Sequence, residues 1–266
     1  MFLIVIDLDG TLVKNFTQND DESFDYLKTL THTQKVVICT GRPYRAAMDY
    51  YQMLNLDTPM INYNGSWVHN PKDPSFTPYH DYLNKEEMAQ VEYHLKDKIH
   101  NFYAEIDDDI YINRIDYAIN EYVNMEGARV FESSLSNLPS DPNSSIIFPK
   151  KGYEQDVFDY IQKNTHSIGL RDLSSPSISL IELYALTSSK GKAVRLIQDY
   201  YHIDRHHTIT IGDGINDISM FDVAKYSVAM GNANDFVKSQ AHYTTLDLDH
   251  HGVKAFLEPF FTSHAK

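Results

Sequence analysis

The sequence has few of the features that mark secreted or membrane proteins. Its 266 residues include one cysteine, Cys39, so no disulfide can form within the chain, and a reducing compartment is expected. No apolar run approaches the roughly 20 residues that a membrane span needs. The first apolar stretch is short and has no basic residue before it, which is unlike a signal peptide. We therefore expect a cytoplasmic protein with no membrane partner.

Basic residues are also in deficit. The chain has 23 Lys and Arg against 37 Asp and Glu, a formal net charge of −14. This balance argues against a nucleic-acid partner, because such proteins present a basic face to the phosphate backbone. It does not exclude a small anionic substrate, since a local metal ion or lysine reverses the field within one cleft. The length favours two domains, or one domain with a large insertion.

The most informative feature present is the amino-terminal segment. Residues 2–6 are all apolar and run directly into Asp7 and Asp9. A continuous apolar run is typical of a buried parallel strand, and ligands of open α/β sheets bind beyond the carboxyl ends of such strands. Because an uncompensated buried carboxylate is costly, the two acids indicate a site for a cation.

Strands and helices alternate at both ends of the chain, whereas the middle has a different pattern. Residues 21–30 have helical spacing, residues 36–39 form a second apolar strand, and a helix begins near Pro43. The alternation returns after residue 187, while residues 83–186 mix short strands and helices. We predict an α/β fold: a doubly wound, Rossmann-like parallel-sheet core formed by residues 1–82 and 187–266. A smaller α+β domain of residues 83–186, with an antiparallel sheet, is inserted into it.

Four motifs place polar side chains directly after a predicted strand or at the start of a helix. Each motif alone is a weak signal, but the four in this order are improbable by chance. Their residues are Asp7 and Asp9 in DLDGT, Thr40 and Gly41 in TGR, Lys190 in SKG, and Asp213, Asn216 and Asp217 in GDGIND.

Together with YNG at 63–65 and VAMGNA at 228–233, these motifs resemble the haloacid dehalogenase-like superfamily. More narrowly, they resemble its Cof-type phosphatases, which carry a mixed α/β cap inserted after the second motif. The resemblance implies a Mg²⁺-dependent phosphatase acting on a small phosphorylated metabolite, most often a sugar phosphate. An aspartyl-phosphate would be the intermediate, and the cap would close over the cleft and select the substrate.

The resemblance also implies roles for the acids. Asp7 would be the nucleophile and a magnesium ligand, and the Asp9 carbonyl would be a second ligand. The Asp9 side chain would protonate the leaving oxygen and later accept a proton from water. Asp213 would complete the protein ligands with Asp217 supporting it, and Mn²⁺ would be tolerated in place of Mg²⁺.

The resemblance implies that the remaining candidate residues bind the phosphate group. Lys190 would neutralise phosphate charge and orient Asp7, while Thr40, the Gly41 amide and, less directly, Asn216 would hold the transferring oxygens. Such help is needed because two unit charges 4 Å apart repel by roughly 4 kcal/mol at an effective dielectric of 20. In the superfamily that the motifs resemble, an acid at the position of Asp9 goes with phosphoryl transfer rather than dehalogenation, which fits the need of an alkoxide leaving group for a proton.

The sequence alone leaves several residue roles and the exact function open. Lys192 competes with Lys190, Asn64-Gly65 is a turn signal in its own right, and Arg42 and Arg45 fit either the rim of a site or the surface. A phosphomutase, or a non-catalytic binding protein of the same fold, is the alternative function. The sequence identifies neither the substrate nor the oligomeric state.

Overall fold

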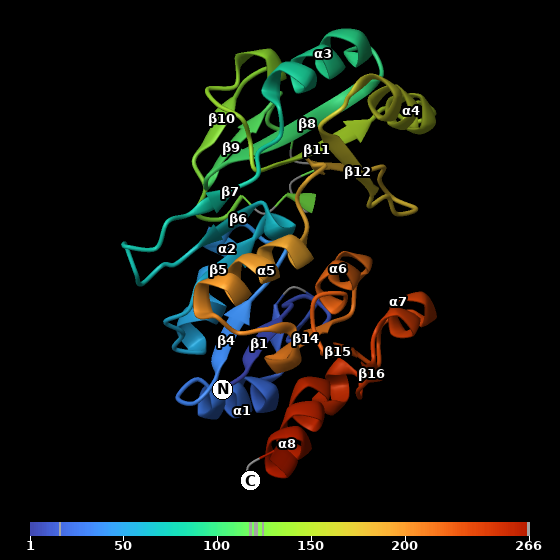
Figure 1. The fold of residues 1–266 in the computed structure, drawn as a ribbon. Helices are drawn as coiled ribbons and strands as arrows, with labels where there is room; N and C mark the ends of the chain where they lie inside the picture. The colour runs from blue at the N-terminus through green and yellow to red at the C-terminus, as the bar shows by residue number, and fades with distance from the viewer. Residues whose placement is uncertain (16, 117–118, 120–121, 124, 265–266) are drawn as a thin grey trace. The chain divides into compact units, whose positions relative to one another are not determined.

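A computed structural model describes residues 1–15, 17–116, 119, 122–123 and 125–264. The chain packs into two compact units. The first contains residues 1–42, 47–79 and 189–266, and the second contains residues 43–46 and 80–188. Figure 1 gives the course of the chain through the elements of each unit.

The first unit is built on a parallel five-stranded sheet, as predicted. Its order is β16–β15–β14–β1–β4, and every neighbouring pair is parallel. In this sheet Ile6 pairs with both Ile38 and Ile211, so three strands end at the same edge. The strands are β1 (Leu3–Ile6), β4 (Lys35–Ile38), β14 (Thr208–Gly212), β15 (Tyr226–Ala229) and β16 (Tyr243–Thr244).

Both faces of this sheet are buried. Leu3 and Val5 join a core with side chains from the helices α5 (Lys190–Tyr201), α6 (Ile218–Phe221) and α7 (Asp235–Gln240). Ile4 and Ile6 point to the opposite face, because side chains alternate along a strand, and they are equally buried. Burial on both faces explains why β1 is a continuous apolar run, and the predicted doubly wound class is confirmed.

The other helices of this unit are α1 (Asp21–Leu30), α2 (Tyr44–Met53) and α8 (Gly252–His264), with α1 and α8 packed together (Figure 1). Asp20 begins α1 by accepting a hydrogen bond from the Ser23 amide, which satisfies a free N–H of the first turn. Pro43 immediately precedes α2.

The predicted turn at Asn64-Gly65 differs in detail from a two-residue hairpin. Strands β5 (Met60–Asn62) and β6 (Trp67–His69) are joined through a short 3-10 turn, Tyr63–Gly65, whose residues all have positive φ, at 49°, 56° and 105°. Gly65 is required there, because a Cβ would lie 2.3 Å from the Ser189 carbonyl oxygen. The turn is thereby pressed against the start of α5.

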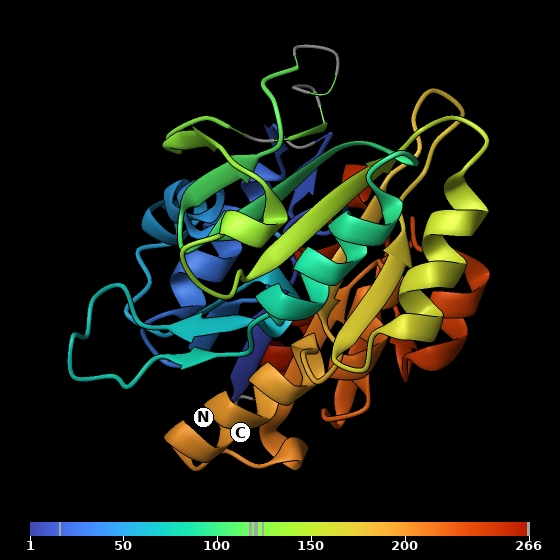
Figure 2. The same ribbon diagram turned by 90° about the horizontal axis from the view of Figure 1, so that it is seen from above.

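The second unit is a six-stranded sheet with two helices on one face (Figure 2). The helices are α3 (Lys85–Leu95) and α4 (Glu154–Asn164). The order is β10–β9–β8–β11–β13–β12, and all pairs are antiparallel except β10 with β9. That one parallel pair was not predicted, and the long connection of residues 113–129 allows it. The strands are β8 (Ile99–Ile106), β9 (Asp109–Ile112), β10 (Val130–Glu132), β11 (Ser144–Pro149), β12 (Ile168–Asp172) and β13 (Ile181–Ala185).

The smaller elements are the hairpin of β2 (Val13–Lys14) and β3 (Gln18–Asn19), strand β7 (Tyr79–His80), and 3-10 helices at Leu135–Asn137, Arg205–His207, Ile215–Asp217 and Leu248–His250. Among the described residues, no helix is both long and apolar enough to cross a membrane.

A single glycine lets α5 approach α6. A Cβ on Gly191 would lie 2.0 Å from the carbonyl oxygen of Ser219, so Gly191→Ala forces the two helices apart. We expect the free energy of unfolding, measured by urea denaturation, to fall by about 1–3 kcal/mol. Arg195→Ala, on an exposed position of the same helix, is the control and should change stability by less than ~0.5 kcal/mol. Equal effects of the two variants would contradict the close helix contact.

Candidate active site

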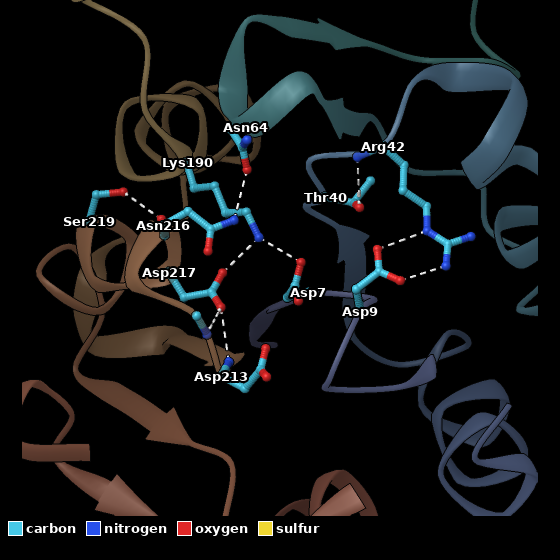
Figure 3. Close-up of polar contacts among 11 residues, drawn as sticks. Asp7, Asp9, Thr40, Arg42, Asn64, Lys190, Asp213, Asn216, Asp217 and Ser219 are labelled. Atoms are coloured by element: carbon cyan, nitrogen blue, oxygen red, sulfur yellow. Dashed lines mark hydrogen bonds and ion pairs between the residues drawn. The ribbon is translucent and has the colours of Figure 1, made fainter. Parts of the chain in front are cut away.

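Three carboxylates meet at the edge where the parallel strands end. Asp7 follows β1, Asp213 follows β14, and Asp217 ends the 3-10 helix one turn further on. One oxygen from each lies within 4.8 Å of the others. Figure 3 shows the three side chains directed into the same region. Over the described part of the chain, no other three acidic, histidine or cysteine side chains come together in this way.

The ammonium group of Lys190 joins two of these carboxylates. Its Nζ lies 2.6 Å from Asp7 Oδ1 and 2.7 Å from Asp217 Oδ1, and the lysine is almost completely buried. Ser189 begins α5 by accepting a hydrogen bond from the Lys192 amide, which places Lys190 in the first turn. The Lys192 ammonium instead lies 5.2 Å from the ring of Tyr79. Of the two lysines left open by the sequence, Lys190 is the one that contacts the acids.

The charges of this cluster do not balance. Burial raises the pKa of Asp7 well above its usual value, and the neighbouring carboxylates add to the effect while Lys190 opposes it. Burial and Asp217 likewise raise the pKa of Asp213 to about 7. Burial lowers the pKa of Lys190, but Asp217 and Asp7 outweigh it and hold the value above its ordinary range. With all three carboxylates ionised, these groups and the one ammonium would carry a charge of −2. The raised pKa values of Asp7 and Asp213 reflect the cost of that state, which a bound cation would lower.

The donor set fits Mg²⁺. The ligand atoms on offer are all oxygen, the donors that this ion prefers, and their spacing allows one ion to touch more than one carboxylate. Asp217 has both oxygens engaged: Oδ1 accepts from Lys190, and Oδ2 accepts from the amides of Asp213 and Gly214 at 2.9 and 2.8 Å. Asp217 therefore fastens the loop that carries Asp213, which leaves Asp7 and Asp213 as the side chains placed to hold an ion.

Asn232 contacts the site, although the sequence analysis did not single it out as a site residue. Its Nδ2 donates to the Gly10 carbonyl at 2.8 Å and to Asp213 Oδ2 at 3.2 Å. It thus links the loop after β1 to the loop after β14. The signal was its place in VAMGNA, just beyond a predicted strand end at the same edge of the sheet.

Three of the predicted phosphate-binding residues, Thr40, Gly41 and Asn216, lie around Asn64. The Asn64 amide donates to the Thr40 carbonyl at 3.0 Å, and Asn216 Nδ2 donates to Asn64 Oδ1 at 2.8 Å. A Cβ on Gly41 would lie 3.2 Å from the side-chain carboxamide of Asn64. Asn64, which the sequence marked mainly as a turn former, therefore lies between Thr40 and Asn216 (Figure 3) and next to Gly41.

Asp9 lies apart from the other acids. Its two oxygens accept hydrogen bonds from Arg42, from Nη2 at 2.6 Å and from Nε at 2.8 Å. Of the two arginines left open by the sequence, Arg42 thus belongs to the site. Arg45 pairs instead with Glu105, in the second unit.

A family model described as haloacid dehalogenase-like hydrolase matches residues 4–257. The chain belongs to this family, as its motifs predicted. It is a phosphatase of the family, because curated relatives that match 90% or more of the chain are named phosphatases.

One relative, YitU of Bacillus subtilis (strain 168), is named 5-amino-6-(5-phospho-D-ribitylamino)uracil phosphatase and is 35% identical over 98% of each chain. A putative phosphatase of Metamycoplasma hominis is 32% identical over 90% of this chain and 89% of its own. Among solved structures, TM0651 from Thermotoga maritima has a TM-score of 0.83 at 23% identity, covering 97% of both chains. At that identity the structural match supports the fold alone.

Replacing Lys190 tests the charge balance. In Lys190→Met, Asp7 and Asp217 stay buried together without their shared ammonium, so we expect the free energy of unfolding to fall by about 3–5 kcal/mol in the absence of divalent ions. Urea denaturation measures the loss. Lys225→Met, at an exposed position, is the matched control and should change stability by less than ~0.5 kcal/mol. A loss no larger than that of the control would show that the ammonium does not stabilise the acids.

Proposed function

We propose that this phosphatase hydrolyses a small phosphorylated metabolite through an aspartyl-phosphate on Asp7. The observation that carries the proposal is the pair of hydrogen bonds from Lys190 to Asp7 and Asp217. Lys190 holds Asp7 in place with one oxygen bound, and the other oxygen is left for a ligand or for phosphorus. Attack by Asp7 forms an oxygen–phosphorus bond as the bond to the leaving oxygen breaks, and water then releases phosphate.

The other site residues have supporting roles in this scheme. Asp9 gives its proton to the leaving oxygen and later accepts one from the attacking water. Thr40, the Gly41 amide and Asn216 hold the phosphate oxygens, which is consistent with their grouping around Asn64. Lys190 offsets part of the negative charge of the incoming ester.

Mg²⁺ is the proposed cofactor, with Mn²⁺ as a substitute. Asp7, Asp213 and the Asp9 carbonyl would hold it, and Asp217 would support them through the loop amides that it binds. When bound, the ion neutralises charge between the carboxylates and the phosphate, so that two anions approach each other. The charge of −2 that the four groups carry when all three carboxylates are ionised supports a divalent rather than a monovalent ion.

The proposed substrate is 5-amino-6-(5-phospho-D-ribitylamino)uracil, by analogy with YitU and with a second relative of that name, YwtE, at 28% identity. Sugar phosphates, the class expected from the sequence, are the second candidate. We further propose that residues 83–186 form the domain that selects the substrate, while residues 1–82 and 187–266 carry the catalytic groups.

Asp7→Asn tests the nucleophile. An amide oxygen is a poor nucleophile towards a phosphate ester, so we expect less than about a tenth of the wild-type rate of phosphate release, with the fold unchanged. Phosphate release from p-nitrophenyl phosphate with Mg²⁺, together with the thermal unfolding midpoint, gives the answer. Asp222→Asn, at an exposed position, should keep full activity. An active Asp7→Asn variant would remove Asp7 from the reaction.

A substrate panel tests the specificity. We expect kcat/KM for the ribitylaminouracil phosphate to exceed that for glucose 6-phosphate and other sugar phosphates by at least about tenfold, the factor that corresponds to ~1.4 kcal/mol of transition-state stabilisation. Phosphate released in proportion to substrate consumed supports hydrolysis, whereas an isomeric phosphate ester as product indicates a phosphomutase. No turnover of any ester in the panel would favour a non-catalytic binding protein.

A further inference from the structure

The carboxylate of Asp9 is held by a two-pronged contact with Arg42. Both hydrogen bonds are short, at 2.6 and 2.8 Å, and come from two nitrogens of one guanidinium group. The Arg42 side chain is 13% exposed and that of Asp9 is 30% exposed, so the pair is only partly open to solvent. Such paired charge-assisted hydrogen bonds fix the plane of a carboxylate as well as its position.

The guanidinium group is itself fixed by other contacts. Its Nη1 donates to the hydroxyl of Tyr50 at 3.2 Å, and its carbon lies 4.9 Å from the centre of the same ring. Tyr50 in turn stacks on the buried ring of Phe24, with centroids 6.0 Å apart. Arg42 is therefore anchored on the side away from Asp9.

The backbone of Arg42 is tied to the predicted phosphate-binding loop. Its amide donates to Thr40 Oγ1 at 3.1 Å, and its carbonyl accepts from Asn62 Nδ2 at 3.0 Å and from the Tyr63 amide at 3.3 Å. Main chain and side chain are thus both restrained. Of the two partners, Arg42 is the better anchored one, so it determines where the Asp9 carboxylate lies.

We propose that Arg42 is the positioning residue for Asp9, orienting its carboxyl group for proton transfer to the leaving oxygen. This inference rests on the proposed function. In the proposed step, the O–H bond of the Asp9 carboxyl breaks as the bond from phosphorus to the leaving oxygen breaks, and the leaving oxygen takes the proton. The hydrogen bonds from Arg42 keep the carboxyl group aligned while this happens.

The experiment compares two esters of the same shape and different leaving groups, p-nitrophenyl phosphate and phenyl phosphate. Nitrophenolate departs readily without a proton, whereas phenolate gains from an acid, so the ratio of the two kcat/KM values reports proton donation. These values cover the steps up to formation of the aspartyl-phosphate. Asp9→Asn shows how far this ratio changes when proton donation is lost completely, because it removes the acid.

Arg42→Met keeps an unbranched apolar stem and removes the guanidinium donors. We expect its kcat/KM for phenyl phosphate to fall at least about tenfold further than that for p-nitrophenyl phosphate, which is a fraction of the roughly 10²–10⁴-fold that general acid–base catalysis contributes. The double variant with Asp9→Asn should have the ratio of Asp9→Asn alone, because the two residues act as one unit. Arg42→Lys, which keeps the charge without the fork, should lie between wild type and Arg42→Met.

If Arg42→Met does not fold, Tyr50→Phe tests the positioning role instead. It removes the hydroxyl that anchors Nη1 and keeps the ring, so a smaller change of the ratio in the same direction is expected. Equal losses on both esters in these variants, or additive losses in the double variant, would overturn the positioning role and leave a purely structural one. A wild-type protein that hydrolyses neither ester, or an active Asp7→Asn variant, would instead overturn the proposed function itself.

Discussion

The site depends on one buried ammonium group. Lys190 reaches Asp7 and Asp217 at hydrogen-bond distance from the first turn of α5, and all three side chains are nearly inaccessible to solvent. A buried lysine with two acids is tolerated only because each charge has a partner of opposite sign. With Asp213 added, the acids outnumber the ammonium by two. This imbalance is the physical reason for expecting a divalent ion.

The fold brings these groups together by aligning strand ends and by close backbone approaches. The matched register of β1, β4 and β14 puts Asp7, Thr40 and Asp213 at one edge of the sheet. The positive φ values at Tyr63–Gly65 are unfavourable for Tyr63, whose side chain disfavours that region. The conformation persists because the turn contacts the start of α5 through Gly65 and the loop of Thr40 through Asn64. Strain is thus located where the loops of the site meet.

Local patterns in the sequence predicted much of this arrangement. The apolar run of β1, the helical spacing of α1 and the fold class follow from burial, because burial determines the pattern of apolar residues within each strand or helix. The acids were also predictable, because each lies just after a strand or at the start of a helix. A lysine at the start of α5 was predicted as well, but the choice of Lys190 over Lys192 depends on which side of α5 faces the sheet.

Contacts between distant segments could not be predicted in the same way. The pairing of Asp9 with Arg42 joins residues 33 positions apart, and an arginine near a site fits the rim or the surface equally well from sequence. Asn232 reaches Asp213 only because β14 and β15 are neighbours in the sheet. The parallel pairing of β10 with β9 likewise cannot be inferred from the sequence of either strand alone.

The central claim is that the acidic cluster binds a divalent ion. Calorimetric titration with Mg²⁺ tests it most directly, because it measures binding of the ion independently of turnover. The account predicts one Mg²⁺ bound per chain, with binding lost in Asp213→Asn and retained in Asp222→Asn. Equal Mg²⁺ binding by the wild type and Asp213→Asn, or none by the wild type at millimolar concentration, would contradict it.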